Sequence, residues 1–593
     1  MSFFGRKKSL DTRYLQLKEQ ADHALTGHRA DLWPSVRDTA WELLREAVMR
    51  FDSDPRAPIV AHATAKIAIV PELASGSWLR VLWIGWAASA AVATLDVASG
   101  PESDTGLMAA LAEDLYRRAE VTAYAAHRAG VPMAGAVLAE QFTSLRLGER
   151  TLWRSILAMA SRSTADLEHV AGVLSTRMQL ARESAGSGGF EFRGEPEQLN
   201  AWFERSIRQE FAAGDQDRRG GRVAMSTGVG AAMEAMRLSG RSLLYVGGGP
   251  EEGVAVLLDA AALNDPDRLI AGSISLPGVD FDSVQRAVAG LHQAAADRRS
   301  RRVSGRVLTE QVEKLLAWLG ESVWRPVLER WPEVSQQPLT VIPLGEFAQL
   351  PLYTATVAGR PACAELDLTI APSARSLVLA GEHPAATGRV LVAADPSSGD
   401  DTLPYVVDEA RAVAAVHGTE PVIYHELAAP AQDDGRLRTA GHPSGESAGP
   451  ELLGRLRGSA LVHLACHGII APDRPLESAL LLGGDLTLET VLAEDLLPGC
   501  TVVLSACDLA GIGTDLPGEQ LGFPGVLLAG AARTVVAALW PVPDTPRTVR
   551  LMTRFHEELR MTTPTRALGA AIGHAFDAGA PGSGWAPFTC FGA

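Results

Sequence analysis

The chain has 593 residues, of which 47% are hydrophobic and 21% are charged, which is ordinary for a globular protein and enough for two to four domains. Its net charge of −16 disfavours nonspecific nucleic-acid binding, which requires a basic surface to displace counterions. Five cysteines are too few for a disulfide framework, so we expect a reducing, cytoplasmic location.

The N-terminus shows no targeting segment. No apolar stretch follows the basic residues 6–8, so we expect no signal peptide. The longest apolar run, residues 81–95, falls short of the roughly 20 residues needed to span a bilayer. We therefore expect a buried helix there and no membrane span.

Residues 10 to about 185 have the periodicity of helices. Trp41, Leu44 and Val48 recur at helical spacing, and breaks are expected at residues 52–55, 100–101 and 130–132. The rhythm of paired helices suggests a tetratricopeptide-like array, but no clean repeat of about 34 residues emerges. A repeat array and an irregular helical bundle both remain open for residues 1–185, which we interpret as a sensor or interaction region.

A Gly/Ser-rich stretch at 184–189 leads into a linker and mixed segment, residues 186–240. The third region, 241–593, begins with two predicted strands, residues 242–246 and 254–258. The glycine-rich segment between them lacks the Lys and Ser/Thr of a phosphate-binding loop. It therefore predicts a hairpin turn.

Two amphipathic helices are expected at 282–298 and 308–330, and strands then alternate with helices. This alternation predicts an α/β fold, with a parallel sheet covered by helices on both faces. A polar stretch at 428–449 predicts an exposed loop. The expected strands are 339–343, 390–394, 421–424, 460–466, 501–506 and 534–539, and the expected helices are 405–417, 450–457, 488–497 and 524–532.

Two of these strands end in residues that could form a catalytic pair. His467 follows one apolar strand and Cys507 follows another. If the strands are parallel neighbours about 4.8 Å apart, the imidazole lies beside the thiol at the edge where α/β sheets form their sites. The thiolate would be the nucleophile, with His467 as its base and proton donor. The backbone N–H groups of Gly468 and Cys507 could then stabilise an oxyanion.

Two other interpretations of these residues remain. His467 and Cys507 could simply end core strands, since buried cysteines are usually inert. A metal site at His463, Cys466 and His467 is the second alternative. In a strand His463 and His467 would be roughly 13 Å apart, and Cys466 would point to the other face. We therefore expect no metal and no cofactor.

The two strand motifs resemble the signature of CHAT domains, which are cysteine peptidases related to caspases and separases. The resemblance covers about 241–593. Besides His463-Leu-Ala-Cys-His-Gly468 and Leu504-Ser-Ala-Cys507, it rests in chain order on Val341-Ile-Pro-Leu-Gly345, Leu350-Pro351, Ala371-Pro-Ser373, Ala394-Asp-Pro396, Leu403-Pro404 with Glu409, Gly518-Glu519, Ala529-Gly-Ala531, Leu539-Trp-Pro541 with Asp544, and Trp585-Ala-Pro587.

The resemblance implies a caspase-like sandwich with a Cys507–His467 dyad that cleaves peptide bonds. In related peptidases an acidic residue near Asp395 helps to bind a basic residue before the scissile bond, and Asp508 could act likewise. The alternative for Asp395 is that it fixes a turn.

The expected function is therefore a cysteine endopeptidase that acts on a specific protein substrate. Its activity would be gated through a protein partner or ligand bound at the N-terminal helical region. The tryptophans of that region could help to anchor the partner, because Trp is enriched at interface hot spots: they are Trp33, Trp41, Trp78, Trp83 and Trp86. The rival interpretation is a non-catalytic scaffold protein with a caspase-like fold.

Overall fold

The structure is a computed structural model, and it divides into two units, Met1–Phe142 with Glu149–Gly230 and Thr143–Gly148 with Ala231–Ala593. We describe each unit by itself. The residues that the structure describes are 9–26, 29–50, 53–54, 56–99, 116–132, 135–136, 139–140, 228–263, 270–299, 304–398, 401–424, 449–469, 471, 477–494, 496–506 and 522–592. The predicted linker at 184–189 lies outside them, as does the predicted loop at 428–449 except for its last residue.

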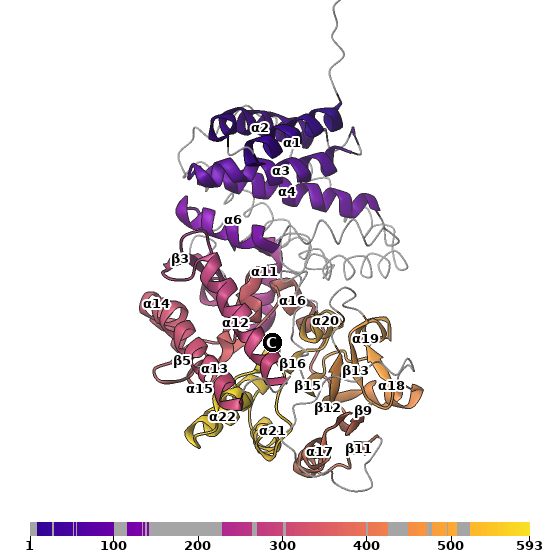
Figure 1. Cartoon of the computed structure of the whole chain (residues 1–593). Coiled ribbons are helices and arrows are strands. Elements are labelled where there is room, and N and C mark those ends of the chain that lie inside the picture. The colour runs from indigo at the N-terminus through magenta and orange to yellow at the C-terminus, as the bar shows by residue number, and fades with distance from the viewer. Residues whose placement is uncertain are drawn as a thin grey trace, which may run out of the picture. The chain divides into compact units, whose positions relative to one another are not determined.

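The first unit is helical throughout its described part, as predicted. Its helices stack in layers (Figure 1) around a core built largely from alanine, leucine and valine. Helix α2 ends before the predicted break at 52–55 and α3 begins after it. The predicted break at 130–132 follows the end of α6, where Gly130 has a positive φ of 71°, which favours glycine. The predicted break at 100–101 lies outside the described residues. The elements are α1 (Leu10–Thr26), η1 (Ala30–Leu32), α2 (Trp33–Val48), α3 (Ala57–Ala74), α4 (Trp78–Ser99) and α6 (Tyr116–Arg128).

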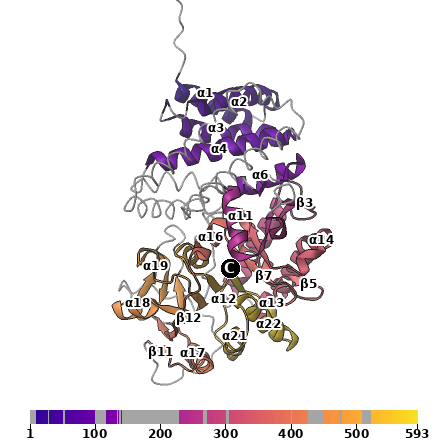
Figure 2. The same ribbon diagram turned by 180° about the vertical axis from the view of Figure 1, so that it is seen from behind.

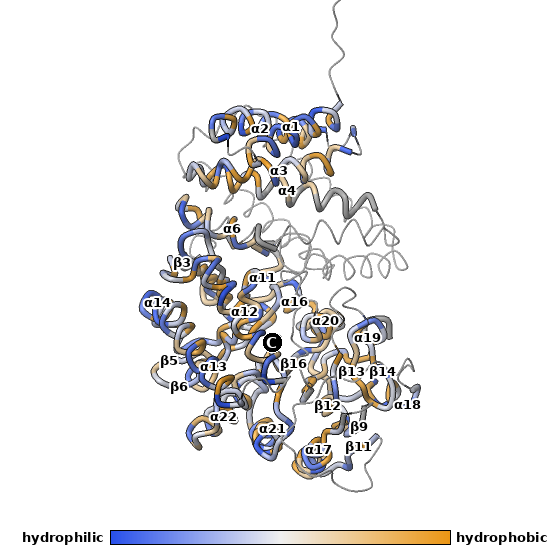
Figure 3. The backbone as a smooth tube through the Cα atoms, viewed as in Figure 1, coloured by the Kyte–Doolittle hydropathy of each residue, from blue (hydrophilic) through white to orange (hydrophobic). Residues whose placement is uncertain are grey.

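Within the described residues, α3 is the one helix whose length and apolar composition would allow it to cross a membrane. Figure 3 shows its mostly hydrophobic colouring. More than half of its length is buried inside the structure, where it packs against α2 and α4. Burial of this extent is what a core helix of a globular domain shows, so the helix is weak support for a membrane span.

The second unit is built on one mixed, mostly parallel sheet. The strand order is β11-β8-β12-β15-β16-β17-β7-β4-β1-β2-β3, with β13 and β14 attached beside β12. The strands are β1 (Ser242–Gly247), β2 (Gly253–Leu258), β3 (Ile270–Leu276), β4 (Leu339–Pro343), β7 (Leu368–Ile370), β8 (Arg389–Ala394), β11 (Val422–Ile423), β12 (Ser459–Ile469), β13 (Ala479–Leu481), β14 (Asp485–Thr487), β15 (Thr501–Ala506), β16 (Thr534–Ala538) and β17 (Phe588–Gly592).

Strand β17 joins the two halves of this sheet. It is antiparallel to β16 and parallel to β7. The strands β8, β12, β15 and β16 therefore run one way, and β17, β7, β4 and β1 run the other. Two short ribbons lie apart from the sheet, namely β5 (Thr356–Val357) with β6 (Arg360–Pro361), and β9 (Ser397–Ser398) with β10 (Asp401–Thr402).

Helices cover both faces of the half-sheet around β12 and β15. Helix α17 packs on β8 and β12 and is itself packed against α21, whereas α20 packs on β16 and α19. Figures 1 and 2 show the strands between these two groups. The helices of the unit are α11 (Gly228–Ser239), α12 (Phe281–Arg299), α13 (Gly305–Leu319), α14 (Arg325–Arg330), α15 (Ala362–Glu365), α16 (Ala374–Glu382), α17 (Pro404–His417), α18 (Pro450–Leu456), α19 (Leu488–Glu494), α20 (Phe523–Ala529), α21 (Pro546–Leu559) and α22 (Pro564–Asp577).

The predicted elements of this unit agree closely with the structure. Strands β4 and β15 have the predicted bounds, and α17 begins one residue earlier than expected. The glycine-rich segment is a hairpin turn, since β1 and β2 pair antiparallel across it. The helix predicted at 308–330 is continuous but contains a π-helical turn, η4 (Gly320–Trp324).

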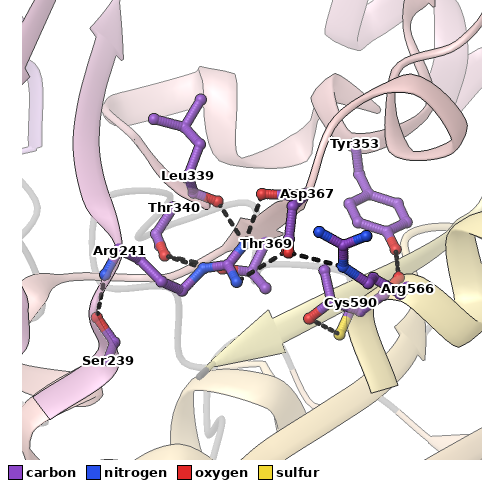
Figure 4. Close-up of polar contacts among 10 residues, drawn as sticks. Ser239, Arg241, Leu339, Thr340, Tyr353, Asp367, Thr369, Arg566 and Cys590 are labelled. Carbon is purple, nitrogen blue, oxygen red and sulfur yellow. Dashed lines mark hydrogen bonds and ion pairs between the residues drawn. The ribbon is translucent and has the colours of Figure 1, made fainter. Parts of the chain in front are cut away.

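A buried arginine ties together the starts of β1, β4 and β7 (Figure 4). The guanidinium of Arg241 pairs with the Asp367 carboxylate at 2.9 Å and donates to the carbonyl oxygens of Leu339 and Asp367 at 2.9 and 2.6 Å. It also donates to the Thr340 hydroxyl at 3.2 Å. From α22, Arg566 reaches the same Asp367 at 3.1 Å. The network fixes three strands that are separated by long stretches of sequence.

Candidate active site

Three parallel strands place their ends at one edge of the sheet. Strand β12 pairs with β8 up to Ala465 and Ala394, and with β15 up to Cys466 and Ala506. The residues that follow these strand ends therefore share an edge. This is the edge at which α/β sheets generally build their sites.

His467 lies at this edge, one residue beyond the last pair between β12 and β15. There β12 continues past the end of β8 and pairs with the antiparallel strand β13, so that His467 is opposite Leu481. Only 3% of His467 is exposed. The imidazole is therefore held in a packed part of the fold.

The direction of the Gly468 backbone N–H follows from the hydrogen bonds of the residues beside it on β12. The carbonyl of Ala465 accepts from the Asp395 N–H at 3.0 Å, so Ala465 directs its backbone groups toward β8. Backbone groups alternate in direction along a strand. His467 then directs its own toward β13, and Gly468 directs its N–H to the opposite side, where β15 lies.

The structure does not describe Cys507 or Asp508, and both lie outside the described residues. The last described residue of β15 is Ala506. The pairing of His467 with Cys507 therefore stays a prediction. Glu519, another landmark of the resemblance, also falls outside.

Asp395 follows the last residue of β8 and is 2% exposed. Its carboxylate accepts a hydrogen bond of 2.9 Å from the N–H of Gly483. Gly483 lies in the turn between β13 and β14 and has a φ of 62°. This contact favours the interpretation that Asp395 fixes a turn, although the turn belongs to the neighbouring hairpin.

The hairpin β13–β14 is part of the site edge that sequence reasoning missed. Its strands are three residues each, too short for a reliable alternation of polar and apolar residues. Its turn is held by Asp395 and packs closely on the Tyr424 ring, since a Cβ at Gly483 would lie 2.5 Å from that ring. The two glycines of the turn, Gly483 and Gly484, were the available signal.

The other cysteines that the structure describes are buried thiols. Burial raises the pKa of Cys500 and of Cys590 to about 12, and it raises the pKa of Cys363 as well. Such thiols carry almost no thiolate near neutral pH, and the thiolate is the nucleophilic form. Cys363, Cys500 and Cys590 are therefore packing residues of the core.

Sequence reasoning also missed a set of hydrogen-bonded polar side chains that connects β12 to helices α17 and α21. His463, four residues before His467 on β12, contacts Glu409 on α17 at 3.0 Å and His556 on α21 at 3.0 Å. Asp544 caps α17 by accepting from the Tyr405 N–H at 3.0 Å. These partners are roughly 50 to 140 residues apart in sequence, so no local pattern reveals them.

The strand order, the two helical layers and the edge position of His467 define an α/β fold of the caspase-like class. Residues 313–593 match the family model of the CHAT domain. This part of the chain is therefore a CHAT domain, as the sequence motifs predicted.

No curated protein matches the chain. Among solved structures, the separase of the Saccharomyces cerevisiae separase–securin complex is similar with a TM-score of 0.38 and 10% identity. That match covers 98% of this chain and 53% of the separase chain, so this chain spans about half the length of that protein.

Proposed function

We propose that the chain is a cysteine endopeptidase that cleaves a specific protein substrate in a reducing compartment such as the cytoplasm. The observation that carries the proposal is the parallel register of β12 and β15, which ends with Cys466 opposite Ala506. The next residues in sequence are His467 and Cys507. Consecutive Cα atoms are about 3.8 Å apart and paired strands about 4.8 Å apart, so this register supports the proposal that the Cys507 thiol reaches the imidazole.

The proposed chemistry needs these two side chains and water. The Cys507 thiolate attacks the scissile carbonyl carbon, and protonated His467 gives its proton to the leaving amine. The thioester that forms is then hydrolysed by a water molecule, whose proton His467 accepts. Collapse of the second tetrahedral intermediate releases the carboxylic acid product and expels the Cys507 thiolate, while His467 keeps the proton taken from water, so the starting pair of thiolate and imidazolium is restored.

The oxyanion of each tetrahedral intermediate requires hydrogen-bond donors. The direction of the Gly468 N–H, away from β13 and toward the side of β15, supports its proposed role as one donor. The backbone N–H of Cys507 is the proposed second donor. Neither donor depends on a side chain, so substitution at Gly468 would act through the backbone.

Specificity can be tested by cleavage of a peptide library with the purified full-length protein. Asp395 and Asp508 are the proposed substrate-binding acids, and a carboxylate binds an arginine by charge-assisted hydrogen bonds. We expect cleavage after a basic residue, absent in the Cys507→Ala protein. Strict preference for aspartate or for an apolar residue before the scissile bond would contradict this role of the two acids.

The alternative is a non-catalytic scaffold, and one observation favours it. His467 is almost fully buried, whereas a catalytic imidazole must meet its substrate. A thiol-reactive peptide probe separates the two functions. Labelling at Cys507 supports the peptidase, and absence of both labelling and cleavage under every activating condition supports the scaffold.

Burial of His467 also supports the proposal that activity is gated. A substrate reaches a buried imidazole only after a conformational change that uncovers it, and a partner that prefers the uncovered state would shift this equilibrium. We propose residues 1–185 as the gate. Three of its tryptophans contact other aromatic rings of the same unit: Trp41 packs against Trp83 in a tilted arrangement with 4.8 Å between ring centroids, and Trp78 meets Tyr124 edge to face at 5.3 Å.

Deletion of residues 1–185 tests the gate. Coupling between sites is typically 1–3 kcal/mol, or about 5- to 150-fold. We expect the 186–593 fragment to differ from the full-length protein in basal peptide cleavage by a factor in this range, and to lose its response to an N-terminal partner. Equal and high cleavage rates for both proteins would show that the helical region does not gate activity.

A further inference from the structure

Four side chains form a continuous hydrogen-bonded chain through the half-sheet that carries His467. Glu409 Oε1 contacts His463 Nε2 at 3.0 Å, His463 Nδ1 contacts His556 Nε2 at 3.0 Å, and His556 Nδ1 contacts His417 Nε2 at 3.0 Å. Both nitrogens of His463 and of His556 are thus used. The chain links strand β12 to helices α17 and α21.

This series of hydrogen-bonded side chains begins in the core at Glu409 and ends at the partly exposed His417. Glu409 is 2% exposed, and His463 and His556 are fully buried. His417, the last residue of α17, has intermediate exposure. A proton can therefore enter the chain from solvent at His417, whereas the carboxylate lies at the closed end.

Before any proton is added, the hydrogen-bond geometry determines which ring nitrogen of each histidine carries the proton. An ionised Glu409 has only acceptors, so His463 must carry its proton on Nε2. His463 Nδ1 is then an acceptor, which places the proton of His556 on Nε2. The same step places the proton of His417 on Nε2. All three imidazoles are neutral in this state, and every contact is a hydrogen bond.

One added proton gives a second state that is equally well bonded. It binds at His417 Nδ1, and the proton on His417 Nε2 moves to His556 Nδ1. The proton on His556 Nε2 then moves to His463 Nδ1. His417 and His556 are then neutral with a proton on Nδ1, and the two hydrogen bonds between imidazoles are reversed in direction. The bond from His463 to Glu409 keeps its direction, and the positive charge rests on His463.

We propose that Glu409, His463, His556 and His417 form a proton-binding site, which takes up a single proton from solvent at His417 and holds it between His463 and Glu409. No buried polar group loses a partner in either state, so uptake does not require the fold to open. The site belongs to the fold and is independent of whether Cys507 cleaves peptides.

The charges around the four side chains favour binding of the added proton at His463. Burial, followed by repulsion from Arg560 and His463, lowers the pKa of His417. Burial, followed by repulsion from His463 and His417, lowers the pKa of His556 far more. Beyond the four members, Arg560, which directly follows α21, is a charged group that acts on His417, and β8 has its one charged residue, Arg389, at its start. Within the four-residue cluster, the Glu409 carboxylate is bonded to His463.

Nitrogen NMR of the full chain tests the proposal directly. With histidine labelled by ¹⁵N, long-range spectra distinguish protonated from unprotonated ring nitrogens, and single His→Gln variants assign the signals. We expect Nε2–H tautomers at His417, His463 and His556 at pH 8. On acidification of the folded protein, His556 and His417 should switch to Nδ1–H while His463 gains a second N–H. The exposed His574 of α22 is the internal reference for a solvated imidazole.

Two variants make the test decisive. Glu409→Gln keeps an oxygen acceptor but removes the negative charge, so we expect the tautomer switch to be lost and His417 to titrate alone. His417→Gln keeps a donor to His556 and closes the solvent end, with the same loss expected at His463, should Glu409→Gln not fold. A wild-type titration confined to His417, or an unchanged switch in either folded variant, would overturn the proposal.

Discussion

Replacement of Cys507 by alanine should reduce kcat/KM for peptide cleavage by about 10⁴-fold or more, the scale at which loss of a nucleophile acts in related hydrolytic mechanisms. His467→Ala should cause a loss of the same order, because thiolate formation and protonation of the leaving amine both depend on the imidazole. The effects should not add in the double variant, since each removes the same catalytic unit. The measurement is turnover of the best library peptide.

The matched controls are neighbours on the same strand. Cys466→Ala, whose side chain points to the other face from His467, should retain activity and lose about 1 kcal/mol of stability. His463→Ala should lower the free energy of unfolding more than it lowers turnover, because it removes the imidazole that contacts the buried Glu409 carboxylate and Nε2 of His556. Full turnover by Cys507→Ala would reject the assignment and leave Cys466 as the candidate nucleophile.

Replacement of Arg241 by alanine should lower the free energy of unfolding by about 3–5 kcal/mol, the usual cost of removing one partner of a buried ion pair. Most of the surface of both partners is inaccessible to solvent, with 9% of the Arg241 side chain and 15% of the Asp367 side chain exposed. The change also leaves the carbonyl oxygens of Leu339 and Asp367 without this donor.

Arg566→Ala is the control, because Arg566 pairs with the same carboxylate but is 64% exposed. An exposed pair is worth about 0–1 kcal/mol. Urea unfolding of the two variants should therefore give well-separated midpoints for the second unit. Similar midpoints would mean that burial of the guanidinium does not determine the stability of this network.

The sequence predicted most of this fold because its central strands are buried on both faces. Strand β15 was predicted with its observed bounds, since six apolar or small residues follow Gly499-Cys500 and precede a polar segment. The edge position of His467 followed from the same reasoning. The sheet is mixed rather than wholly parallel, because β17 and the β1–β2–β3 meander add antiparallel pairs.

What the sequence could not reveal is the pairing of distant polar groups. Arg241 meets Asp367 across 126 residues, and His463 meets His556 across 93. Neither pair belongs to a short motif, and each forms only once the sheet and its helices are assembled. The hairpin β13–β14 was missed for a different reason, since its six strand residues are too few to show a period.

The central position of β17 in the sheet means that the complete sheet can form only after the last strand has been synthesised. Residues 588–592 lie between β16 and β7, so until they leave the ribosome both of those strands are open edges. Open edges can pair with other chains, and domains generally fold as units while the chain emerges N-terminus first. The half-sheet with His467 and the half-sheet fixed by Arg241 can each form early, but they become one sheet only when this strand inserts between them.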